Sequence, residues 1–92
     1  MVSPSVEQIK ADILHKLFRK RKWGASHTAI DNLHKSCPPH LKGKYVEIAD
    51  ELVKCGLILA KPTGYGVEVS LNPRRREEIL LLVRKFFADL FA

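Results

Sequence analysis

Two clusters of basic residues are the most chemically distinctive feature of this sequence. Arg19-Lys20-Arg21-Lys22 forms the first cluster, and Arg74-Arg75-Arg76 forms the second. Residues 1–23 carry a net charge of +4 and residues 74–92 carry +2, whereas residues 24–73 are neutral overall. The total charge of +6 favours an anionic partner, such as nucleic acid, an acidic protein or a membrane surface.

The arginine cluster occupies an unusual place, because residues 72–76 are typical of the start of a helix. Cations in a first turn oppose the helix dipole, and three neighbouring cations repel one another. Glu77 and Glu78 offset only part of this cost, so we predict that the arginines bind phosphate or an acidic partner. For residues 19–22 two interpretations stay open. They form a phosphate-binding patch, or a solvated helix C-terminus where each cation contributes about 0.3–1 kcal/mol.

The remaining reactive residue types match no catalytic or metal-binding motif. The segment His34-x-x-Cys37-x-x-His40 has a spacing that a metal ion can use, but two prolines interrupt it and no CxxC pair is present. His27 and Asp31 lie four residues apart with no nucleophile motif beside them. We therefore expect no enzyme activity, no catalytic residue, no metal and no cofactor.

Length and composition indicate one globular domain. The chain has 92 residues, of which 46% are hydrophobic and 28% charged, and this length leaves no room for a second domain. Its longest aliphatic run, residues 79–83, is far shorter than the roughly 18 residues that span a bilayer. The N-terminus lacks the apolar segment of a signal peptide. We expect a cytoplasmic protein with no membrane partner.

The first half of the chain predicts three helices. Ser5 and Gln8 form a capping box, and apolar residues at helical spacing follow until the basic cluster, which predicts a helix over residues 5–21. Ser26 as an N-cap and the prolines at 38–39 bound a shorter helix over residues 26–36. A third helix is predicted over residues 42–55, and Gly56 is suited to end it.

The second half predicts a β-hairpin and a last helix. Residues 57–61 and 67–71 are short β-prone runs on either side of a turn that contains proline and two glycines. Val67, Val69 and Leu71 alternate with polar residues, which predicts that they face the core while Glu68 and Ser70 face water. Asn72-Pro73 opens a helix that extends nearly to residue 92.

These elements resemble a winged helix-turn-helix domain of the small dimeric MarR-like regulators of bacteria and archaea. Leu52-Val-Lys-Cys-Gly56-Leu-Ile58 is similar to the exit from the recognition helix into the first wing strand. Lys61-Pro-Thr-Gly-Tyr-Gly-Val-Glu-Val-Ser-Leu-Asn-Pro73 is similar to the wing itself. The resemblance covers residues 24–73 and leaves flanking helices at about 5–21 and 74–91. It implies an α+β, mostly α fold within a single domain of residues 1–92.

The resemblance also implies a function, namely sequence-specific binding of double-stranded DNA by a homodimeric transcriptional regulator. The helix over residues 42–55 would then enter the major groove and the wing would touch the backbone. The DNA-binding residues expected on this basis lie at the start of that helix, on the wing and in the two basic clusters: Lys42, Lys44, Glu47, Lys61, Tyr65, Arg74, Arg75, Arg76, Arg19, Lys20, Arg21 and Lys22. For Tyr65 the alternative is that its ring packs over the hairpin.

Two features depart from the family pattern. The connection over residues 36–41 contains two prolines and is longer than the usual turn. The exposed side of the third helix carries Glu47, Asp50 and Glu51, which repel phosphates unless they pair with Lys54 or face away from DNA. These carboxylates keep a second function class open, namely a winged-helix interaction module that binds an acidic protein partner.

The last helix is more apolar than a small core requires. Ile79 and Val83 begin an apolar stripe that neighbouring leucines and phenylalanines widen. This excess favours burial against a second copy of the chain, and the alternative is a monomer with an exposed apolar terminus. The dimer interface is expected at Leu80, Leu82, Phe87 and Phe91. No small-molecule effector can be deduced from the sequence.

Overall fold

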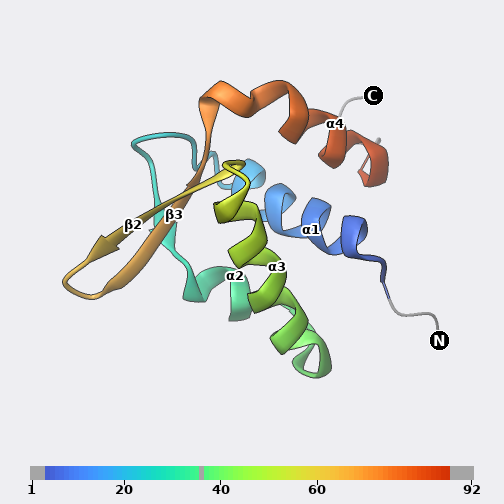
Figure 1. Ribbon diagram of the computed structural model, residues 1–92, viewed down its shortest axis with the longest axis horizontal. Coiled ribbons are helices and arrows are strands. Elements are labelled where there is room, and N and C mark those ends of the chain that lie inside the picture. Colours follow the sequence, from blue (N-terminus) through green and yellow to red (C-terminus); the bar gives the residue numbers. More distant parts are fainter. Residues whose placement is uncertain (1–3, 36, 88–92) are drawn as a thin grey trace.

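The computed structural model describes residues 4–35 and 37–87. Within them the helices are α1 (Val6–Arg19), α2 (Asp31–Lys35), α3 (Lys42–Lys54) and α4 (Arg76–Phe86), and the strands are β1 (Thr28–Ala29), β2 (Ile58–Thr63) and β3 (Gly66–Leu71) (Figure 1). Short 3₁₀ helices, Pro39–Leu41 and Pro73–Arg75, precede α3 and α4. The described chain is therefore α+β and mostly helical, as predicted, and it is compatible with a winged helix.

The core lies where α1 packs against α3, α4 and the sheet. Figure 1 shows α1 between α3 and α4. Ile13, Leu14 and Leu17 of α1 are fully buried against Leu52 of α3 and Ile79 of α4. Each of these buried aliphatic side chains contributes about 1.5–3 kcal/mol of hydrophobic stabilisation. Burial of one stripe on each helix thus fixes how the three long helices are arranged.

The ends of α1 and α3 follow from their capping residues. The predicted capping box is confirmed, because Gln8 N donates to Ser5 Oγ (3.1 Å) and Ser5 N donates to Gln8 Oε1 (2.8 Å). Gly56, with φ of 86°, ends α3 as predicted. Behind Gly56, the Leu57 amide donates to Leu52 O over 3.1 Å. The left-handed conformation of Gly56 lets the amides of Gly56 and Leu57 donate to carbonyl groups in the last turn of α3.

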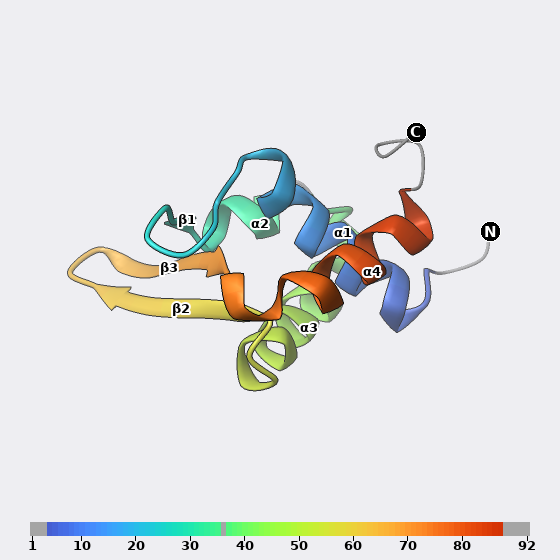
Figure 2. The same cartoon turned by 90° about the horizontal axis from the view of Figure 1, so that it is seen from above.

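The sheet is antiparallel, with strand order β1-β3-β2. The predicted hairpin is confirmed, and its register runs from the pair Ile58 and Leu71 at the base to the pair Thr63 and Gly66 near the tip. Figure 2 shows the hairpin projecting away from the helices. β1 adds a third strand that the sequence did not predict, with Thr28 opposite Val69.

The predicted helix over residues 26–36 is wrong in its first half. Thr28 and Ala29 pair with β3, and the Ile30 amide donates to Val67 O (2.9 Å), so α2 starts only at Asp31. A two-residue strand has no periodicity of its own, and its pairing partner lies some 40 residues away in the chain. Long-range hydrogen bonding overrides the local helical pattern here.

The predicted faces of β3 also need correction. Val69 and Leu71 are buried as expected, but Ser70 is only 1% exposed and Val67 is 38% exposed. β3 is the central strand and the chain after α1 covers its second face, so Ser70 is enclosed there and its hydroxyl donates to Gly24 O (2.8 Å). Val67 lies toward the hairpin tip, beyond the reach of the core.

The flanking helices are shorter than predicted. α1 ends at Arg19 instead of residue 21, and α4 begins at Arg76 after a 3₁₀ turn instead of at Pro73. The prediction that the last helix extends to residue 92 falls partly outside the described residues, which end at Phe87. Among the helices described, none is long and apolar enough to cross a membrane.

We expect the stability of the fold to fall in mild acid because of His15. This residue is 9% exposed, and its ring stacks on Phe87 with centroids 4.1 Å apart. Burial, and then the charge of Arg19, lowers the pKa of His15 below its ordinary value of 6.5. The unfolded chain therefore takes up a proton at a higher pH than the folded chain, and the free energy of unfolding falls as pH drops through 6.5 toward the folded pKa.

Urea denaturation at about pH 7.5 and about pH 5, on either side of the ordinary histidine pKa, measures this effect. His15→Leu should lose part of the difference in stability between the two pH values, whereas His40→Gln, at an exposed position, should keep it. An equal pH difference in all three proteins would contradict the assignment to His15.

Candidate nucleic-acid interface

The end of β3 is hydrogen-bonded to the segment that follows α1. Leu71 N donates to Lys22 O (2.7 Å), and Gly24 N donates to Leu71 O (3.0 Å). Gly24 has φ of 56°, and a Cβ at this position would lie 3.3 Å from Pro73 Cγ. The close approach of these segments brings the end of α1 beside the start of α4, although Arg19 and Arg76 are 57 residues apart in the chain.

The two basic clusters consequently lie on either side of Trp23. The Arg76 guanidinium lies over the Trp23 ring, 5.3 Å from its centroid, in a cation–π contact. Apart from Arg75, five cations of the two clusters are exposed and Lys22 is partly exposed. We call this region the basic surface and define it by Arg19, Lys20, Arg21, Lys22, Arg74 and Arg76.

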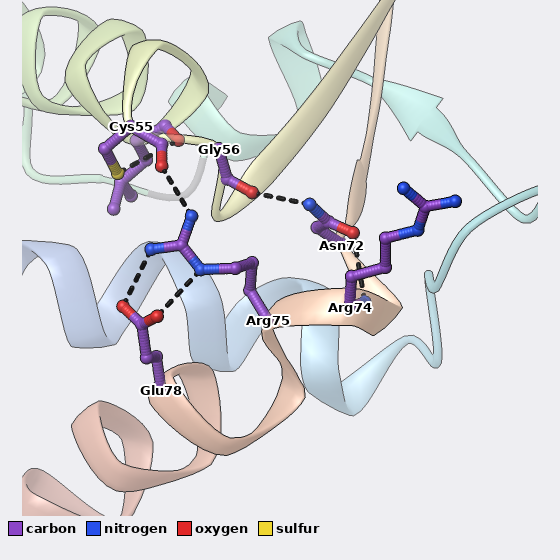
Figure 3. A network of polar contacts seen from close by, with 7 residues as sticks. Cys55, Gly56, Asn72, Arg74, Arg75 and Glu78 are labelled. Atoms are coloured by element: carbon purple, nitrogen blue, oxygen red, sulfur yellow. Dashed lines mark hydrogen bonds and ion pairs between the residues drawn. The ribbon is translucent and has the colours of Figure 1, made fainter.

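Arg75 belongs to the same sequence cluster but is engaged within the chain (Figure 3). Its Nε and Nη2 atoms donate to the two carboxylate oxygens of Glu78 over 2.7 and 2.9 Å, and Nη1 donates to Cys55 O over 3.0 Å. The guanidinium lowers the pKa of Glu78. Arg75 thus neutralises the carbonyl end of α3 and ties it to the start of α4.

Asn72 orients the chain just before the arginines. Its Nδ2 donates to Gly56 O (2.8 Å), and its Oδ1 accepts from Arg74 N (3.1 Å), as expected of the predicted N-cap. Figure 3 shows the Arg74 side chain pointing away from the Arg75 network. The helix proper starts at Arg76, so the electrostatic conflict predicted for three arginines in one helical turn is relieved by the intervening 3₁₀ turn and by Glu78.

Arg21 has a backbone conformation that favours glycine. Its φ is 55°, and it is the one residue other than glycine with positive φ in the described chain. It follows the last turn of α1, where Lys22 N donates to Leu17 O and Arg21 N donates to Phe18 O, each over 3.0 Å. Gly56 occupies the same position after α3. An L-residue in this conformation costs about 1–2 kcal/mol relative to the right-handed one.

The start of α3 holds the predicted groove-facing residues. Lys42 and Lys44 are exposed, and Lys44 Nζ lies 4.0 Å from Glu47 Oε2. Further along, Asp50 pairs with Lys54 at 3.0 Å, as the sequence predicted. Both carboxylates therefore have a cation beside them on the same helix, which lowers their repulsion of phosphate without abolishing it.

The hairpin presents Lys61, within β2, and Tyr65, in the turn, to solvent. The exposed fraction of Tyr65 is 104%, so its ring does not pack over the hairpin and the alternative suggested for it is wrong. Thr63 Oγ1 accepts from Tyr65 N (3.2 Å) and donates to Gly66 O (2.9 Å), which holds the turn. The Thr63 hydrogen bonds hold the turn in one conformation, and the Tyr65 ring remains exposed for contacts with a partner.

The predicted DNA contacts do not form one continuous surface. Arg75 fixes the carboxyl end of α3 beside the basic surface, and α3 is 13 residues long, which places Lys42 at the opposite end, about 18 Å away at the helical rise. Figure 1 shows the start of α3 at the far end of the helix from the start of α4. Lys42 and Lys44 are thus separate from the basic surface.

The residues predicted for the dimer interface have different environments. Leu82 and Phe87 are partly buried against the core of their own chain, and Leu80 is half-buried. Leu81, which was not predicted, is the most exposed leucine described, at 68%. Phe91 lies outside the described residues. The apolar surface left on α4 is therefore smaller than the sequence suggested.

The described residues contain no group of three His, Cys, Asp or Glu side chains that could hold a metal ion. Comparisons with protein-family models, with curated proteins and with solved structures find no match to this chain. The function must be argued from its own geometry. The sequence identified every cation of the basic surface but not the role of Trp23, because only the pairing of Leu71 with the segment after α1 reveals it.

Proposed function

We propose that this chain is a winged-helix protein that binds double-stranded DNA, and that the basic surface contacts the phosphate backbone. Support comes from six cations of two segments that are far apart in the sequence and that the pairing of Leu71 with the segment after α1 brings together. Cations in contact with phosphates release condensed counterions, and this release supplies most sequence-independent affinity for DNA. The short strand between α1 and α2 and the hairpin after α3 are compatible with the winged-helix part of the proposal.

The single observation that carries this proposal is the conformation of Arg21. A glycine would satisfy the same helix end without strain, as Gly56 does for α3. A side chain kept in a strained backbone position indicates a function for that side chain. Arg21 lies among the cations of the basic surface and is exposed, so the function we assign to it is a phosphate contact.

In this proposal α3 and the wing make the remaining DNA contacts. Lys42 and Lys44 lie at the exposed start of α3, where a recognition helix meets base edges, and Lys61 within β2 and Tyr65 in the hairpin turn lie on the proposed wing. The chain then acts as a transcriptional regulator. The second candidate is an interaction module for a protein partner, which the carboxylates Glu47 and Asp50 on α3 favour.

We also propose that the regulator is a homodimer. The supporting feature is now Leu81, which lies with Leu80 between Glu77 and Arg84 on the outer face of α4. A two-fold axis across this face would bury the two leucines and place Glu77 opposite Arg84 of the second copy.

Arg21→Gly tests the phosphate contact, because stability and binding should change in different directions. The free energy of unfolding should stay the same or rise by up to about 1 kcal/mol, since the strain is relieved while the unfolded chain gains entropy. Affinity for random duplex should fall, and the slope of log K against log salt should flatten by about 0.9. Urea denaturation and fluorescence anisotropy measure the two quantities.

Lys10→Ala is the matched control, because Lys10 lies on α1 well before the basic surface. It should leave both affinity and slope unchanged. If Arg21→Gly binds duplex as tightly as the native chain, with the same slope, the basic surface does not contact phosphates.

The role of α3 can be measured with single substitutions. Lys44→Ala should weaken binding to a duplex selected from a random pool and flatten the salt slope by about 0.9. Glu47→Ala should raise affinity for every duplex alike, because it removes a repelling carboxylate. A loss of base preference of roughly 1–3 kcal/mol in Glu47→Ala would instead assign it a base contact. If neither change alters DNA binding, α3 is not a recognition helix and the interaction module becomes the better function.

Light scattering at micromolar concentration measures the oligomeric state. We expect twice the chain mass of 10.5 kDa, and Leu81→Glu should shift the protein toward the monomer without unfolding it. A native chain that is monomeric at every accessible concentration would exclude the dimer.

A further inference from the structure

A groove that lies apart from the basic surface separates α3 from the hairpin. Its volume is about 470 Å³, within the range of about 300–1,000 Å³ that ligand sites occupy. The elements that surround it are α2, α3 and the two long strands, and Figure 1 shows α2 and α3 on the side of the molecule away from α4. Its apolar lining consists of Ile30, Val46, Val53, Ala60 and Val67.

The apolar lining is not covered by the chain's own core. Val46 and Val67 are 43% and 38% exposed, and Ile30 and Val53 are only partly buried. Valine and isoleucine in a concave surface favour an apolar occupant, because burying them removes apolar area from water. The occupant therefore carries aliphatic side chains.

Two carboxylates, Glu47 and Asp50, also line the groove. Their side chains are 62% and 61% exposed, so they are available to a ligand at the rim. Lys44, at 4.0 Å from Glu47, and Lys54, paired with Asp50, sit on the same helix and neither lines the groove. These carboxylates disfavour the DNA backbone as an occupant and favour a ligand that brings its own cation.

One polar residue of the lining, His34, has an unpaired atom. Its Nε2 is buried and has no hydrogen-bond partner among the described residues, and the residue lines the groove. A buried polar atom without a partner is unfavourable, and a rotation of the His34 ring toward the groove would let Nε2 pair with a peptide N–H or carbonyl group of an occupant.

We propose that this groove binds a short segment of a partner protein that carries aliphatic side chains and a neighbouring lysine or arginine. The proposal does not need the basic surface, because the groove contains none of its residues, but the groove includes Glu47 of α3, so a partner seated there takes the place of the recognition-helix contacts proposed above. A chain that bound both would link a DNA site to a second protein. Glu47 faces the groove in this arrangement, so it contacts the partner and not a base.

Two peptide sets that differ only in charge provide the probe. The peptides of both sets are twelve residues long and contain two leucines four positions apart. The residues that flank the leucines are lysines in one set and glutamates in the other. Titration of ¹⁵N-labelled full-length chain should move amide signals of α3 and β2 with the lysine set only. Val46→Ser should weaken this binding about tenfold, the effect expected from losing one buried valine contact.

Two matched controls keep the result specific. Val6 on α1 has the same exposure as Val46, at 42% against 43%, so Val6→Ser should leave peptide binding unchanged. Glu47→Gln combined with Asp50→Asn should weaken the lysine set at least about fivefold, which is about 1 kcal/mol. Glu51→Gln, a carboxylate of α3 outside the groove, should not. Circular dichroism establishes that each variant is folded.

The proposal fails if neither peptide set moves these signals, or if both bind equally well. It also fails if duplex DNA moves the α3 and β2 signals and displaces the peptide, which would make the groove part of the DNA site. Concentration-dependent shifts without peptide would assign the groove to a second copy of the chain and would equally overturn the proposal. Loss of DNA binding in Arg21→Gly with peptide binding intact would leave both proposals standing.

Discussion

Backbone hydrogen bonds between Leu71 and the segment after α1 are the constraint on which the arrangement of charges depends. They run from Leu71 N to Lys22 O and from Gly24 N to Leu71 O. Leu71 itself is fully buried, so these bonds are protected from water. They fix the end of β3, and hence the arginines that follow it, beside the lysines and arginines that follow α1. Without them the two basic clusters would be independent surface features.

The charged residues divide into those that hold the fold and those that remain for a partner. Arg75 is used within the chain, where it satisfies the carbonyl end of α3 and pairs with Glu78. Arg74 and Arg76 are exposed, and Arg76 uses only the face of Trp23. One run of three arginines therefore serves both purposes. Glu47 and Asp50 of α3 have lysines beside them, and the net positive charge remains concentrated on the basic surface.

Much of the fold was predictable because its signals are local. The capping box at Ser5, the αL glycine at Gly56 and the cap at Asn72 each determine an element boundary through neighbours in the sequence. β1 was not predictable, since Thr28 and Ala29 form a strand only through pairing with β3. Long-range pairing also explains the wrong prediction for Ser70. The alternation of apolar and polar residues in β3 predicted that Ser70 faces water, but the segment after α1 covers it.

The candidate site was predictable in its residue types but not in its geometry. Runs of arginine and lysine are visible in the sequence, whereas their meeting at Trp23 depends on long-range pairing. The groove was missed because its lining combines four residues of α3 with one residue of each long strand and with residues 30 and 34, which are far from α3 and the strands in the sequence. Val46 and Val67 look like core residues in the sequence, and only the position of the hairpin relative to α3 leaves them exposed.

The measurement that tests the central claim most directly is the affinity of the native chain for random duplex DNA as a function of salt concentration. If the basic surface contacts phosphates, log K should fall linearly with log salt with a slope of about −3 to −5, since each contact contributes about −0.9 and six cations are present. A slope near zero, or no binding at low salt, would contradict the account and leave the basic surface without the function proposed for it.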